Sequence, residues 1–92
     1  MKVKYKYDEK RLEIKETANE ADIEIFITLF DSELKNNLKK VRDYFDENKI
    51  ISDIYYYIHP NNRYQIIARK DFYNVFMIQL FKQQLLQEIK WV

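Results

Sequence analysis

Residues 22–30 read DIEIFITLF, and this stretch decides the fold that the sequence predicts. Apolar side chains at every second position from Ile23 onward fall on one face of an extended chain, while Phe26 and Thr28 fall on the other. Alternation of this kind in a run rich in β-branched residues is typical of a β-strand. Because apolar groups occur on both faces, we expect this strand to be central in its sheet.

The segments downstream of this strand indicate the architecture. Apolar residues at helical spacing predict a helix over 32–48, and period-two patterns predict strands at 50–58 and 63–70, separated by a His-Pro-Asn-Asn turn. A second, largely apolar helix is predicted over 72–84. Residues 85–92 fit either a closing strand or a continuation of this helix, and we favour the strand.

The segment before the central strand predicts a hairpin. Residues 2–7 and 11–16 both alternate, and a short polar link joins them, so we expect residues 1–16 to form an N-terminal β-hairpin. Residues 22–92 then have the order of the ferredoxin-like split β-α-β (βαββαβ) fold, an antiparallel sheet with two helices on one face. The sequence therefore predicts a single α+β domain over residues 1–92.

The composition limits the chemistry that this chain can perform. Its 92 residues are 47% apolar and 34% charged, the balance of a folded domain. The lack of cysteine excludes disulfides and thiolate metal sites, and the lack of glycine excludes phosphate-binding loops. A formal charge of +1 does not favour nucleic-acid binding. No membrane span or secretory signal is indicated, so we expect a cytoplasmic protein that does not bind membranes.

Residue types that carry catalysis or bind metals lack the partners they need. His59 is the only histidine, and no carboxylate lies beside it in the sequence, so we interpret it as a turn residue. The acidic residues do not follow calcium-loop spacing, and Ser32 has no glycine-rich elbow. We therefore expect no catalytic, cofactor-binding or metal-binding residues, no cofactor and no enzymatic activity.

The second predicted helix is a candidate protein interface. It carries more large apolar side chains than a small domain readily buries, and methionine and aromatic residues are enriched at interface centres. The alternative is that the helix is clamped between the sheet and the N-terminal hairpin. The candidate interface residues are Phe72, Tyr73, Phe76, Met77, Leu80 and Phe81.

Aromatic residues on the predicted strands suggest a second kind of surface. Residues 25–30 and 62–69 lie on the first and third strands of the βαββαβ order. With Phe26 and Tyr64 on these strands, the layout resembles an RNA-recognition motif, in which both strands present rings on which bases stack. The chain departs from that motif because both third-strand glycines are missing and Ile66 stands where a second ring is expected. The resemblance implies a stacking platform made of Phe26, Tyr55, Tyr57 and Tyr64.

The function that we expect rests on the surplus of apolar surface. A sheet that is apolar on both faces needs a second cover, which the hairpin, another subunit or a ligand can provide. We expect a non-catalytic protein-interaction or regulatory module that self-associates as a homo-oligomer and whose protein partner the sequence does not name. The alternative is an RRM-like module that binds single-stranded RNA through its strand aromatics.

Overall fold

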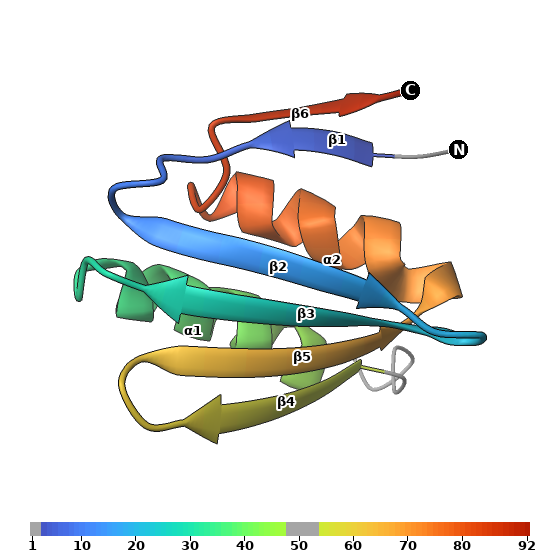
Figure 1. Ribbon diagram of the computed structural model, residues 1–92, viewed down its shortest axis with the longest axis horizontal. Coiled ribbons are helices and arrows are strands. Elements are labelled where there is room, and N and C mark those ends of the chain that lie inside the picture. Colours follow the sequence, from blue (N-terminus) through green and yellow to red (C-terminus); the bar gives the residue numbers. More distant parts are fainter. Residues whose placement is uncertain (1–2, 48–53) are drawn as a thin grey trace.

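The computed structural model describes residues 3–47 and 54–92. Its elements are β1 (Val3–Lys6), β2 (Leu12–Ala18), β3 (Asp22–Leu29), α1 (Leu34–Glu47), β4 (Ile54–His59), β5 (Arg63–Arg69), α2 (Lys70–Lys82) and β6 (Glu88–Trp91). A four-stranded antiparallel sheet has the order β2-β3-β5-β4, and β1 pairs with β6 in a separate two-stranded sheet. Both helices lie behind the larger sheet (Figure 1). The predicted α+β class with antiparallel strands is confirmed.

The predicted central strand is β3, which lies between β2 and β5. Its Ile25 and Ile27 side chains are 0% and 1% exposed within the core, whereas Phe26 is 39% exposed on the opposite side. The core continues into α1, whose stripe of buried residues faces the sheet. The period-two pattern of residues 22–30 therefore separates a buried face of the sheet from an exposed one.

The N-terminal hairpin expected over residues 1–16 does not form, and the ferredoxin-like strand order is wrong. All of β2 pairs with β3, starting with Leu12 opposite Leu29, so β2 occupies the edge that this order reserves for the last strand. β6 pairs with β1 instead. Two properties favour β2 over β6 at this edge: β2 is the longer strand, and it is closer to β3 along the chain. β2 provides seven residues and reaches β3 through a short loop, whereas β6 provides four and would close a much longer one.

The strand expected within residues 85–92 is confirmed as β6, because α2 ends before it. Gln84 has a φ of 65°, in the left-handed region that glycine usually occupies at helix ends. The N–H of Leu85 donates to the carbonyl of Leu80 at 2.9 Å, and the N–H of Gln84 donates to that of Phe81 at 3.0 Å. This pair of bonds is a Schellman motif, which turns the chain out of the helix toward β6.

The turn between β4 and β5 uses asparagine where other chains use glycine. Asn61 and Asn62 have φ values of 64° and 58°, which asparagine tolerates better than most residues. The N–H of Leu29 donates to the carbonyl of Asn62 at 3.0 Å, so the turn is also tied to β3. A chain without glycine can therefore still form this tight hairpin.

Candidate functional site

The side of the four-stranded sheet that faces away from the helices is the open face. In Figure 1 it is turned toward the viewer, and none of the described elements lies over it. Side chains alternate along a strand, and paired residues share a face, so the register assigns each residue to one side. One row across the open face consists of Lys15, Phe26, Gln65 and Tyr57.

Three exposed aromatic rings lie on the open face. Phe26, Tyr55 and Tyr57 are 39%, 53% and 48% exposed. The register places Phe26 and Tyr57 on either side of Gln65, and Tyr55 lies in the next row. Three of the four residues predicted as a stacking platform therefore share this surface.

Tyr64, the fourth predicted platform residue, lies on the other face of the sheet. It pairs with Ile27 and Ile58, and its side chain packs against the hydrophobic core. A shift of one position along a strand moves a side chain to the opposite face, and it is Gln65 that lies opposite Phe26. The resemblance to an RNA-recognition motif therefore pointed to the right strand, β5, but to the residues on its core side and not to those on the open face.

A hydrogen-bonded chain crosses the open face between the rings. The Nε2 atom of His59 lies 2.9 Å from Oε1 of Gln65, and Nε2 of Gln65 donates to Oε2 of Glu24 at 3.0 Å. Because the Gln65 oxygen accepts, Nε2 of His59 carries the proton in this arrangement. His59, interpreted from the sequence as a turn residue, is the last residue of β4 and takes part in this network. Neither Gln65 nor Glu24 was predicted from the sequence to be part of a site. The available signal was the alternation along β5, which places Gln65 on the opposite face from Tyr64.

The polar surroundings of the rings carry charges of both signs. Lys15 forms an ion pair with Glu13 at 3.7 Å, and both lie on the open face. A hollow of about 480 Å³ opens beside Phe26 where the β4–β5 turn meets the sheet. Its lining residues are Phe26, His59, Pro60, Asn61, Arg63 and Gln65. The site is thus a shallow aromatic surface with a mixed polar border.

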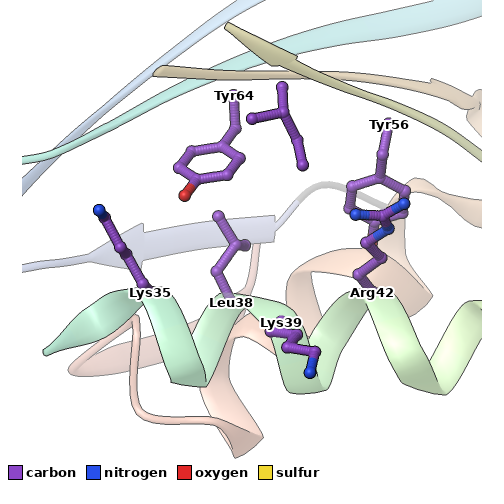
Figure 2. Close-up of a pocket in the computed structure, with 7 residues that line it drawn as sticks. Lys35, Leu38, Lys39, Arg42, Tyr56 and Tyr64 are labelled. Carbon is purple, nitrogen blue, oxygen red and sulfur yellow. The ribbon is translucent and has the colours of Figure 1, made fainter. Parts of the chain in front are cut away.

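A second hollow, of about 230 Å³, lies on the helix side of the sheet between α1 and β4. Figure 2 shows Lys35, Lys39 and Arg42 extending from α1, with Tyr56 and Tyr64 reaching down from the strands. Its walls are mainly apolar and its helical side is basic.

The hydroxyl group of Tyr56 is buried beside this second hollow. It has no hydrogen-bond partner within residues 3–47 and 54–92. Burial, together with the negative charge of Asp46, raises the pKa of Tyr56 well above its ordinary value, because both disfavour the phenolate. The hydroxyl therefore stays neutral over the physiological pH range.

The candidate interface on α2 is divided between the core and the surface. Phe76, Met77 and Leu80 are 0% exposed, so these three residues are not available to a partner. Phe72 and Tyr73 are half-buried, while Phe81 is 42% exposed. α2 contacts β3 and β5 on one side and β6 on another, so it is clamped between the two sheets. The middle of this helix is therefore part of the core, and Tyr73 and Val75 pack against that core, whereas Phe81 remains at the surface.

The described part of the chain contains no group of three histidine, aspartate or glutamate side chains placed to hold a metal ion. None of its helices has the length and apolar character needed to cross a membrane. Comparison with known proteins finds no match, whether to a protein-family model, a curated protein or a solved structure.

Proposed function

We propose that this chain is a non-catalytic protein-interaction module that binds a partner protein through the open face of its four-stranded sheet. The observation that carries the proposal is the exposure of Phe26, Tyr55 and Tyr57 on one face while both helices cover the other. Tyr55 and Tyr57 are neighbours on one side of β4, Phe26 lies across Gln65 from Tyr57, and aromatic residues are enriched at interface centres.

The border of the open face supports a protein partner over a polyanion. Lys15 and Arg63 lie on this face together with the carboxylates of Glu13 and Glu24. A mixed polar border around apolar rings is the usual composition of a protein interface. A phosphate backbone would instead meet two carboxylates, which weaken its attraction to the cations.

Photo-crosslinking in cells tests this proposal. Phe26 is replaced by p-benzoylphenylalanine, which keeps an aromatic ring on the central strand β3. The matched control carries the same group at Phe81 on α2, because the two side chains are 39% and 42% exposed. We expect a discrete protein adduct from position 26 and none from position 81.

The pattern of adducts separates the alternatives. Adducts from both positions, or from neither, would contradict an interaction surface on the open face. Adducts from position 81 alone would transfer the interface to α2, as one interpretation of the sequence suggested. Adducts from position 26 that disappear on nuclease treatment would favour RNA as the partner.

The second candidate function is binding of single-stranded RNA. One observation favours it: Phe26 lies on the central strand with Lys15 directly opposite, so a base stacked on the ring would have a cation nearby. We expect Phe26→Ala to abolish any quenching of tyrosine fluorescence by oligonucleotides, and the affinity to fall with added salt. No quenching at low salt would exclude this function. The cytoplasmic location and the lack of enzymatic activity stay predictions from the sequence.

A further inference from the structure

The two edges of the four-stranded sheet, β2 and β4, are protected differently. At the β2 edge, the hydroxyl group of Tyr7 accepts a hydrogen bond from the N–H of Ile14 and lies equally close to its carbonyl, 3.3 Å in each case. β2 also carries charged side chains, which hinder pairing with other chains. At the β4 edge, no strand in the described part of the chain pairs on the outer side. Residues 54–58 contain neither a charged residue nor a proline.

The register shows which residues of β4 point their backbone groups outward. In an antiparallel strand the N–H and C=O of one residue point to the same side, and the side alternates along the strand. Ile14 points away from β3, because its groups bond to Tyr7. Ile27 lies opposite Ile14 on one side and Tyr64 on the other, so the backbone groups of Ile27 point toward Tyr64 and the two residues exchange hydrogen bonds. Tyr64 in turn lies opposite Ile58. Because the backbone groups of Tyr64 point toward β3, those of Ile58 point away from β5, toward the outside of the sheet. The outward-pointing residues of β4 are Ile54, Tyr56 and Ile58.

The sequence of this edge is complementary to itself. Residues 54–58 read IYYYI, which is the same in both directions. When two copies pair antiparallel about Tyr56, Ile54 lies opposite Ile58 of the second copy, and each such pair exchanges both N–H···O bonds. Every outward backbone group in this stretch is then satisfied. Paired residues share a face, so the open face of one copy continues into that of the other.

We propose that β4 pairs with β4 of a second copy in this register and forms a two-fold symmetric dimer with one continuous sheet. The inference rests on the proposed role as an interaction module and names a second copy as one partner. Tyr55 of each copy then lies opposite Tyr57 of the other, which places an aromatic cluster at the centre of the joined open faces. A symmetric, self-complementary contact of this kind closes on itself and does not extend into a fibre.

The charges near the two-fold axis are compatible with this pairing. Arg42 lines the same hollow as Tyr56 and forms an ion pair with Asp46 at 3.7 Å. A two-fold axis through Tyr56 relates this ion pair to the same pair of the second copy. Each pair contributes one cation and one anion, so these residues add no net charge of one sign to either copy.

Sedimentation equilibrium over a wide concentration range tests whether the dimer forms. We expect the mass to rise from that of an 11.5 kDa monomer toward twice that value. Ile58→Lys places an edge lysine at a side chain that is 63% exposed, so it should keep the fold and remain monomeric. The matched control is Phe30→Lys, because Phe30 is 58% exposed between β3 and α1 and should dimerise like the unchanged chain.

Disulfide trapping tests the register, since the chain has no cysteine of its own. Tyr55→Cys and Tyr57→Cys variants are mixed in equal amounts and oxidised. In the proposed register, Cys at 55 lies directly opposite Cys at 57 of the second copy, in the closely spaced type of pair that a disulfide can span. We expect disulfides between one Tyr55→Cys chain and one Tyr57→Cys chain to be more abundant than random pairing of the two variants would give.

Three results would overturn the inference: a monomer at every concentration, a dimer that Ile58→Lys leaves intact, or disulfides formed mainly between identical variants. These results leave the proposed function standing if Phe26 still crosslinks to a different protein. The reverse result, a β4 dimer without any adduct from position 26, would retain the dimer and remove the broader role of the open face.

Discussion

The hydroxyl group of Tyr5 on β1 donates a hydrogen bond to the carboxylate of Glu16 on β2, and so joins the two sheets where their backbones do not pair. The same carboxylate, Glu16, also acts on Tyr73 of α2, whose pKa it helps to raise. Burial first, and Glu16 second, raise the pKa of both tyrosines above the ordinary value of 10.0. One carboxylate on β2 therefore ties down β1 through Tyr5 and raises the pKa of tyrosines on both β1 and α2.

Alkaline pH should weaken this fold through Tyr5 and Tyr73. Their pKa values are higher in the folded chain than in the unfolded chain, so their contribution to stability is complete below pH 10.0 and is lost as the pH rises toward the folded values. Urea unfolding between about pH 8 and pH 12 measures this loss. Glu16→Gln should make the decline shallower, and Glu9→Gln, an exposed control, should not change it.

Removal of the Tyr7 hydroxyl should destabilise the β2 edge. Tyr7→Phe leaves the N–H and C=O of Ile14 without their present partner, and we expect the free energy of unfolding to fall by about 1 kcal/mol. Tyr57→Phe is the matched control, because its ring is 48% exposed on the open face. Equal unfolding midpoints in urea for the two variants would show that the Tyr7 hydroxyl contributes nothing to stability.

The two ends of the apolar stretch on α2 should respond very differently to truncation. Phe76 is 0% exposed, and its ring centroid lies 5.9 Å from that of Phe45, so Phe76→Ala should cost about 3–5 kcal/mol. Phe81 is 42% exposed, so Phe81→Ala should cost less than about 1 kcal/mol. Urea denaturation gives both values, and Phe76→Leu can be used if the alanine variant does not fold. Similar costs would contradict the clamped position of the helix.

Tyr56→Phe should stabilise the chain. The buried Tyr56 hydroxyl lacks a hydrogen-bond partner among the described residues, and its removal should raise the free energy of unfolding by about 1 kcal/mol. Tyr55→Phe, at a side chain that is 53% exposed, should leave the stability unchanged. Both variants are measured by thermal unfolding at low protein concentration. A destabilised Tyr56→Phe would indicate that the hydroxyl has a partner in solution.

Local patterns in the sequence predicted most of the individual elements. The alternation in residues 22–30 identified the central strand and its two faces, and the spacing of Leu34 and Leu38 identified the buried stripe of α1. The turn signal before Arg63 marked the β4–β5 hairpin correctly. These features depend on the period of one segment, and neighbouring residues in the chain are enough to define it.

The candidate site was only partly predictable. Of the four residues predicted as a stacking platform, Phe26, Tyr55 and Tyr57 lie on one face of the sheet, whereas Tyr64 lies on the other and faces the core. Both alternating sets on β5 contain apolar side chains, so the sequence did not distinguish the two faces of that strand. The register with β3 makes the distinction, and Gln65 takes the central position on the open face.

By itself, the sequence determined where the strands and helices lie and excluded chemistry that depends on cysteine or glycine. Only the tertiary structure decided which strand lies beside β3, because β2 and β6 compete for the same edge. Pairing between separate segments depends on loop length, on the number of residues that can join the ladder and on what covers the remaining surface. The tertiary structure also left β4 as an edge strand without a partner among the described residues. Only at such an edge can the symmetric IYYYI sequence pair with a second copy of itself.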